Sequence, residues 1–251
     1  MIRKKLLLLL FVLSLIGCTK DSTPSTKAPN LKTTGASASD LLSDDYYTSL
    51  HLEIAYVEGY KPSDQALSIL SNFFQKRIYK PDGITMEMHS VASSGKSPFS
   101  IEEIADIEKK QRTKYNSGDE IVVWIYFADG KDEKDDNEKR TLGSAFRNTS
   151  IVIYEKSIKD FSNQIGAPPK EILEATTLEH EFCHLFGLVD LGAPLLSNHQ
   201  DPENEHHCAT AGCLMNAELE FGSGIADVIN DSSVPDLKQA CINDLRAAGG
   251  K

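Results

Sequence analysis

The sequence is short of positive charge. Its 251 residues include 26 Lys and Arg against 37 Asp and Glu, which gives a formal net charge of −11. Proteins that bind nucleic acid neutralise phosphates with clustered Lys and Arg, so this composition argues against a nucleic-acid partner, and we expect none. Hydrophobic residues make up 40% and charged residues 25% of the chain, as in ordinary globular domains. A collagen-like or wholly disordered chain is therefore excluded.

Apolar runs long enough to span a bilayer are also lacking. The stretch from Leu6 to Ile16 covers 11 residues and is broken only by Ser14, and three basic residues precede it. That length suits a signal peptide rather than a membrane span. The stretch ends in Leu-Ile-Gly-Cys18, which resembles a bacterial lipobox. The resemblance implies that Cys18 is lipid-modified and becomes the mature N-terminus.

These features predict the organisation of the chain. Residues 1–17 are expected to be a lipoprotein signal peptide. Residues 18–45, rich in Ser, Thr, Pro, Lys and Ala, are expected to be a flexible tether, and residues 46–251 a single domain. The predicted location is the bacterial cell envelope, with the domain facing the periplasm or the cell surface. Nothing predicts an oligomer, so we expect a monomer.

Cysteine is scarce beyond Cys18. The four others are Cys183, Cys208, Cys213 and Cys241, which allow three disulfide pairings that sequence alone does not choose between. Cys208 and Cys213 are close enough for a short disulfide loop, and this is our first expectation. Cys183 lies in an apolar helical pattern and is expected to be an inert buried thiol.

Strand and helix patterns alternate along the domain. Strands are expected at residues 50–56, 84–91, 121–127, 142–146 and 151–154, and helices from residue 62, from residue 98 and over residues 168–188. An irregular stretch follows, then a final helix with Pro235 near its start. The order predicts an α/β fold in which helices pack on a mixed, twisted sheet. The acidic segment 129–140 is expected to be a solvated loop, although calcium binding there stays open.

The segment His180-Glu181-Phe182-Cys183-His184 carries the chemistry. Two His four residues apart project from the same face of a helix, where they can bind one Zn²⁺. Glu181 follows the first His, so its carboxylate can take the proton of a water activated by the metal. Apolar neighbours indicate that this helix is buried, and buried imidazoles need partners.

The same segment resembles the zinc peptidases called metzincins. Gly187 follows His184 by three residues, as in H-E-x-x-H-x-x-G, and Cys213-Leu-Met215-Asn resembles the Met-turn of that family. His207 precedes Met215 by eight residues, and His207-Cys208-x4-Cys213-x-Met215 is similar to the archaemetzincin arrangement. The resemblance implies a metzincin-like catalytic domain with His207 as the third zinc ligand.

The chain also departs from that pattern. The usual third ligand comes three residues after the Gly, where this chain has Asp190, and His199 lies in the same window. His207, His199 and Asp190 therefore remain alternatives. The second metal site of archaemetzincins needs a later C-x-x-C, which is absent, so we expect Cys208 and Cys213 to be structural and not metal ligands.

Taken together, the sequence predicts a zinc-dependent endopeptidase with Glu181 as general base and His180 and His184 as ligands. Residues 142–146 are the candidate strand for pairing with a peptide or protein substrate. All eight Tyr precede residue 155, which excludes a Tyr ligand after the Met-turn. A zinc-binding adhesion module, or an enzyme for a non-peptide amide, is the alternative.

Overall fold

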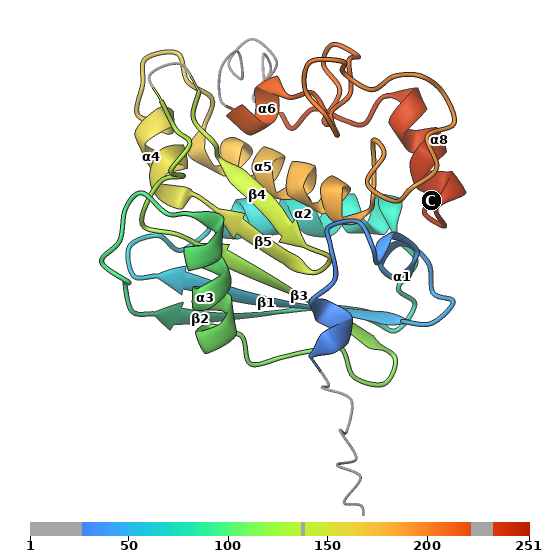
Figure 1. Ribbon diagram of the computed structural model, residues 1–251, viewed down its shortest axis with the longest axis horizontal. Coiled ribbons are helices and arrows are strands. Elements are labelled where there is room, and N and C mark those ends of the chain that lie inside the picture. Colours follow the sequence, from blue (N-terminus) through green and yellow to red (C-terminus); the bar gives the residue numbers. More distant parts are fainter. Residues whose placement is uncertain (1–26, 137–138, 222–232) are drawn as a thin grey trace, which may run out of the picture.

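In the computed structural model, residues 27–136, 139–221 and 233–251 are described (Figure 1). The predicted signal peptide and Cys18 lie outside these ranges. Within them, no helix combines the length and apolar character needed to cross a membrane. The strands are β1 Ser49–Val57, β2 Gly83–Val91, β3 Glu120–Phe127, β4 Gly143–Arg147 and β5 Ser150–Ile153. The helices are η1 Ala28–Asn30, α1 Ala38–Leu42, α2 Asp64–Arg77, α3 Ile101–Gln111, α4 Glu155–Ser162, α5 Lys170–Leu185, α6 Glu218–Phe221 and α8 Gln239–Ala247.

The strands form one sheet in the order β2-β1-β3-β5-β4. β1 pairs in parallel with β2 and with β3, and β3 pairs in parallel with β5. β4 lies at the edge and is antiparallel to β5. The apolar run of β3 from Ile121 to Phe127 is buried throughout, because a central parallel strand is covered on both faces.

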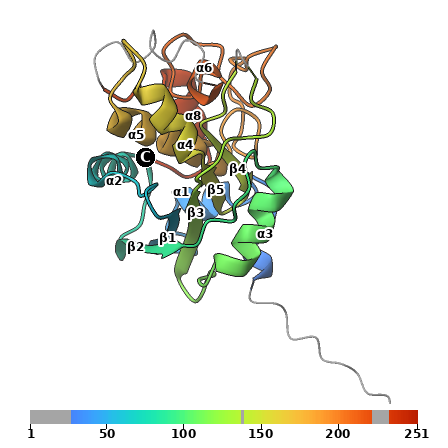
Figure 2. The ribbon, with the colours of Figure 1, turned by 90° about the vertical axis from the view of Figure 1, so that its left-hand side faces the viewer.

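Helices cover both faces of the sheet. α2 and α5 lie on one face and α3 on the other (Figure 2). The larger core cluster joins apolar side chains of α2, α5 and α8 to the sheet, and a smaller one includes Trp124, Tyr126 and Ile104 on the α3 side. The predicted fold class, a mixed sheet packed by helices and followed by an irregular segment with a final helix, is confirmed.

Local sequence signals account for where the helices begin. The Ser63 hydroxyl accepts a hydrogen bond from the Ala66 N–H at 3.1 Å and caps α2. At the start of α3, Ser100 and Glu103 cap each other's backbone N–H groups in a capping box. α4 was not expected from the sequence, because its eight residues are too few for a clear helical period.

The expectation that residues 18–45 form a flexible tether is wrong for residues 27–45. Asn30, Leu41 and Leu42 are fully buried, and the backbone of residue 79 donates to the carbonyl of Leu42 at 2.8 Å. Two adjacent Leu in a polar stretch are enough to anchor a short helix when each is completely removed from water. The folded domain therefore includes residue 27 onward.

Candidate functional site

Helix α5 carries the two predicted histidines and the predicted base. It contacts α2, α4, α6, β4 and β5, and its residues from Ile172 to Leu185 are buried. Phe182 and Leu185 face the large apolar core. This leaves His180, Glu181 and His184 on the side of the helix that faces β4 and the irregular segment, and all three are nearly inaccessible to solvent.

The chain turns sharply at Gly187, directly after α5. Gly187 has φ +74°, a left-handed conformation that favours Gly. A Cβ atom there would lie 2.7 Å from the amide nitrogen of Ala193, so the close approach also requires Gly. The turn sends the chain back past α5 and allows a distant residue to reach the two histidines.

That distant residue is His207. One ring nitrogen from each of His180, His184 and His207 lies within 4.8 Å of the other two. The ring centroid of His207 is 5.3 Å from that of His180 and 5.2 Å from that of His184. Asp190 is exposed and belongs to neither candidate metal group among the described residues. His199 belongs to a second group. Of the three alternatives for a third ligand, the fold thus brings His207 to the pair.

Backbone carbonyls orient two of these rings. His180 Nδ1 lies 2.7 Å from the Leu214 carbonyl oxygen, and His207 Nδ1 lies 2.8 Å from the Glu205 carbonyl oxygen. A carbonyl oxygen only accepts, so Nδ1 donates in each case and the Nε2 atom of a neutral ring keeps its lone pair. Metal-binding histidines are commonly held in this way.

The ring nitrogens fit a single zinc ion. His180 Nε2 and His184 Nε2 are 3.1 Å apart. Two nitrogens at tetrahedral positions around one zinc, each at 2.0–2.1 Å, would be separated by about 3.3 Å. Burial, followed by the positive charge that His180 and His207 would carry, holds the pKa of His184 well below its usual value. A neutral imidazole is the form that binds metal.

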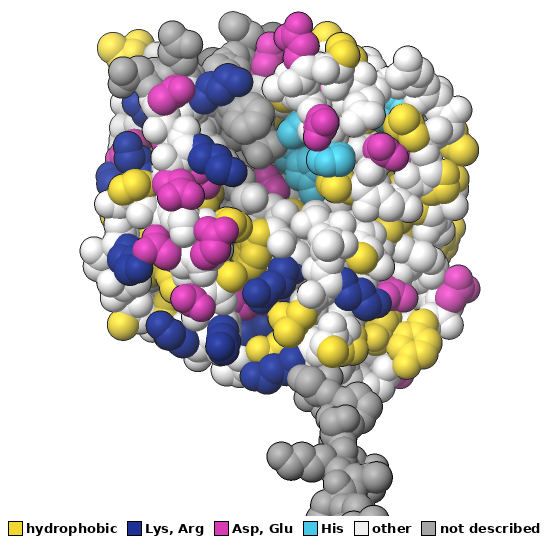
Figure 3. Space-filling view, in the orientation of Figure 1, with side chains coloured by type: hydrophobic (Ala, Val, Ile, Leu, Met, Phe, Trp, Pro, Cys, Tyr) yellow, Lys and Arg dark blue, Asp and Glu magenta, His cyan; other side chains and the backbone are white. Residues whose placement is uncertain are grey.

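Glu181 lies where the helix meets the edge strand. A Cβ atom on Gly143 of β4 would be 3.1 Å from Glu181 Oε1, so the carboxylate lies directly beside the strand. Glu181 and β4 both border a cavity of about 320 Å³, together with His184 and His207. Its lining residues are Thr34, Ser144, Ala145, Glu181, His184, Leu191, Glu205, His206 and His207. Histidine side chains gather on this face of the molecule (Figure 3).

The predicted Met-turn lies under His180. Leu214 supplies the carbonyl for His180, and Met215 is fully buried in the main core. The turn is closed by Asn216 N–H donating to the Cys213 carbonyl at 2.9 Å. The Met215 carbonyl accepts from the Cys208 N–H, which ties this turn to the residue after His207. The turn and the third histidine are therefore fixed relative to each other.

Backbone strain is concentrated around the cavity. Val189, Asp190 and His206 have φ values of 54°, 69° and 65°, which non-Gly residues adopt at a cost. His206 Nδ1 lies 3.3 Å from the Val189 carbonyl oxygen, so the two strained turns are linked. Such strain is often found at functional sites.

A second cluster lies behind the first. His199, Cys208 and Cys241 place their ligand atoms within 4.8 Å of one another, and Cys213 Sγ lies 3.6 Å from Cys241 Sγ. Cys241 Sγ is 3.8 Å from His199 Nδ1. Two sulfurs bound to one tetrahedral zinc at 2.3 Å would be about 3.8 Å apart, and a sulfur and a nitrogen somewhat less. This donor set fits a zinc ion.

Hydrogen bonds orient the ring of His199 and favour the metal-binding form of Cys208. The buried Asp244 accepts from His199 Nε2 at 2.7 Å, which leaves Nδ1 facing the thiols. Hydrogen bonds from Cys213 and Cys241 lower the pKa of the Cys208 thiol, and a thiolate is the form that binds metal.

This geometry bears on two predictions about the cysteines. The predicted Cys208–Cys213 disulfide is not formed, since all four described cysteines are free thiols. The expectation that Cys208 and Cys213 are structural and not metal ligands stays a prediction, but the fold brings Cys208 together with His199 and Cys241 of α8 in a group that could hold a metal ion. Sequence analysis missed Cys241 and His199 as partners because they lie 33 residues after and nine residues before Cys208. The absence of a C-x-x-C obscured the site.

The comparisons with known proteins are sparse. No protein-family model matches the sequence, and no curated protein matches it. Among solved structures, the chain is similar to archaemetzincin from Methanopyrus kandleri, with a TM-score of 0.49 and 15% identity over 80% of this chain and 96% of that one. This likeness is too low to assign a function, which has to be argued from the residues of the site.

Proposed function

We propose that this chain is a zinc-dependent endopeptidase. The observation that carries the proposal is the convergence of His180, His184 and His207 near Glu181, next to a cavity bordered by β4. When bound, zinc would lower the pKa of a water molecule and polarise the scissile carbonyl. The three imidazoles would hold the metal, and the carbonyls of Leu214 and Glu205 would orient two of them.

The remaining steps belong to the chain's own residues. Glu181 takes a proton from the attacking water and passes it to the leaving amine. Its place against Gly143 puts that exchange beside the edge strand. A substrate in extended conformation would add to the outer edge of β4 by backbone hydrogen bonds, and this would hold its carbonyl over the base.

Replacement of the base tests the proposal. We expect Glu181→Ala to bind zinc as the wild type does and to cleave a mixed peptide library at least about 100-fold more slowly, because general-base catalysis contributes that much or more. Metal content and product formation are measured on the full-length chain. Equal cleavage by both proteins would contradict the role of Glu181. Zinc in both without cleavage by either would favour a binding module or a non-peptide amide substrate.

We also propose that a second zinc ion is held by His199, Cys208, Cys213 and Cys241. The support is that His199, Cys208 and Cys241 place their ligand atoms within 4.8 Å of one another and that Cys213 Sγ lies 3.6 Å from Cys241 Sγ. The free thiols and the orienting carboxylate of Asp244 add to it. Four protein ligands leave no open position, which is typical of a structural zinc. His207 and Cys208 are adjacent, so this ion would fix the third ligand of the first site.

A cell-envelope location is proposed on the sequence alone. The basic start, the apolar stretch and Leu-Ile-Gly-Cys18 would direct export and lipid attachment. The acidic chain would then be held by acyl chains and not by attraction to anionic lipid. We expect Cys18→Ala to abolish incorporation of labelled palmitate in the bacterial host, whereas incorporation equal to wild type would contradict the lipobox assignment.

A further inference from the structure

An N-terminal segment crosses one end of the proposed cleft. We call residues 30–37 the strap. Thr34, in the strap, lines the same cavity as Glu181 and His184. Its hydroxyl donates to the Ala145 carbonyl at 3.0 Å. The strap therefore occupies part of the β4 edge with which a substrate would have to form hydrogen bonds.

The Ala145 carbonyl points to the outer edge of β4. In an antiparallel pair, alternate residues turn their hydrogen-bonding groups toward the partner strand and away from it. The Leu142 carbonyl accepts from the Tyr154 N–H at 2.9 Å, toward β5. Ala145 lies three positions later, so its backbone N–H and carbonyl point away from β5. Thr34 thus takes an acceptor that would otherwise be open to an added strand.

The strap also reaches the opposite wall. A Cβ atom on Gly35 would lie 1.9 Å from the Leu191 carbonyl oxygen, so the two backbones are in direct contact there. Gly35 has φ +77°, and both the contact and this conformation require Gly. Leu191 lines the cavity as Thr34 does. The strap consequently closes the space between β4 and the turn after α5.

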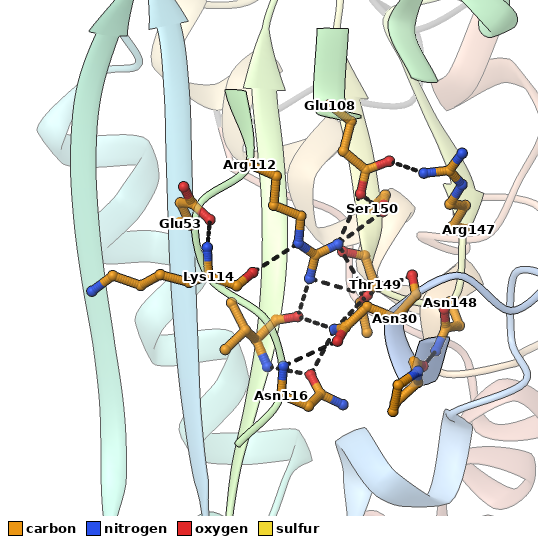
Figure 4. Close-up of polar contacts among 12 residues, drawn as sticks. Asn30, Glu53, Glu108, Arg112, Lys114, Asn116, Arg147, Asn148, Thr149 and Ser150 are labelled. Atoms are coloured by element: carbon orange, nitrogen blue, oxygen red, sulfur yellow. Dashed lines mark hydrogen bonds and ion pairs between the residues drawn. The ribbon is translucent and has the colours of Figure 1, made fainter. Parts of the chain in front are cut away.

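The strap is firmly attached at its base (Figure 4). The buried Asn30 side chain donates to the Val122 carbonyl at 3.1 Å and to Thr149 Oγ1 at 3.0 Å. Asn148, just after β4, donates from its backbone to the Lys32 carbonyl, and its side-chain oxygen accepts from the Lys32 N–H. Buried hydrogen bonds of this kind are costly to break, so the strap is a fixed boundary.

For a peptide that pairs antiparallel with β4, the strap lies on the N-terminal side of the bond to be cut. A peptide added antiparallel to β4 places the residue beside Ala145 before the residue beside Gly143. Glu181, the proposed base, lies beside Gly143. Residues of the substrate that precede the scissile bond therefore run toward Thr34.

We propose that the strap makes this chain selective for peptides with few residues before the cut. Gly143 and Ala145 are two positions apart, and a strand advances about 3.3 Å per residue, so there is room for about two substrate residues before Thr34. The proposal rests on the proposed peptidase function. It adds a limit on the number of substrate residues that precede the scissile bond, and none on the number that follow it.

Two peptide series test the limit. Both share one cleavable sequence, and one is lengthened at its N-terminus and the other at its C-terminus. We expect kcat/KM to fall once more than about two residues precede the cut, and to hold steady as residues are added after it. Equal cleavage of short and long N-terminal extensions would overturn the strap proposal and leave the peptidase intact. No cleavage of any peptide would overturn both.

A substitution in the strap separates its effect from that of the remaining cleft. Thr34→Ala removes the hydroxyl and releases the Ala145 carbonyl. We expect it to raise kcat/KM for the long N-terminal peptide, relative to the short one, by about 2- to 10-fold, the value of one hydrogen bond. Thr33→Ala, at the neighbouring exposed residue, is the matched control and should leave this ratio unchanged. An unchanged ratio in Thr34→Ala would contradict the proposal.

Discussion

At the scale of single residues, buried carboxylates distinguish this chain from an ordinary acidic protein. Glu155 at the start of α4 is fully buried. Its Oε1 lies 2.6 Å from Lys170 Nζ, and Lys170 also contacts Glu174. Two carboxylates share one ammonium group, so the ammonium neutralises only part of the charge. Burial, together with the negative charge of Glu174, raises the pKa of Glu155 to about 8.

This raised pKa predicts how stability depends on pH. The folded chain keeps a proton on Glu155 that the unfolded chain loses near pH 4.5, so the free energy of unfolding should fall as pH rises from about 4.5 to about 8. We expect a loss of about 4 kcal/mol from this group between pH 5 and pH 8, at about 1.4 kcal/mol per pH unit. Urea unfolding at pH 5 and pH 8 measures it. The free energy of unfolding of Glu155→Gln should fall less over that range. That of Glu102→Gln, at an exposed position, should fall as much as that of the wild type.

At the scale of elements, the active-site helix and the edge strand could be predicted, and the N-terminal segment could not. The period of apolar residues around His180 and His184 indicates a buried helix, and α5 ends at Leu185, close to the expected end. The apolar stretch of β3 likewise predicts a central strand. Residues 27–45 carry no such period. Their order depends on Asn30 and on two Leu that contact distant residues, which a local pattern does not contain.

The candidate site shows the same division. The two histidines and the base lie within five residues, so their spacing alone predicts that they meet. His207 is 23 residues beyond His184, and the sequence left it as one of three alternatives. What brings it to the pair is the left-handed turn at Gly187 and the carbonyl of Glu205. The second cluster depends on α8 packing against the Met-turn, a long-range contact that spacing does not reveal.

At the scale of the whole molecule, the second cluster joins the C-terminal helix to the loop that carries His207. Cys241 and Asp244 belong to α8, while His199 and Cys208 belong to the irregular segment. If this cluster holds zinc, the ion replaces part of the apolar packing that an irregular segment cannot supply. Loss of the ion should then destabilise both α8 and the loop that carries His207.

Metal analysis tests this connection. We expect two zinc ions per wild-type chain and one in Cys241→Ser, with a free energy of unfolding lower by several kcal/mol, on the order expected for a structural zinc. Peptide cleavage should also fall, because His207 would be less firmly placed. Cys183→Ala, which changes a buried thiol outside the cluster, should retain both ions. Two ions in Cys241→Ser would contradict the assignment of Cys241.

The strap has a consequence for how separate copies of the chain meet. An uncovered edge strand is a template on which another copy can pair, and such pairing leads to aggregation. β4 is one edge of the sheet, and its far end is covered where Thr34 bonds to Ala145 and Lys32 bonds to Asn148. The uncovered part of β4, beside Gly143, is too short to pair stably with a strand of another copy but long enough to bind a peptide. At the β4 side of the sheet, the chain thereby keeps an edge for recognition while it limits pairing with another copy there.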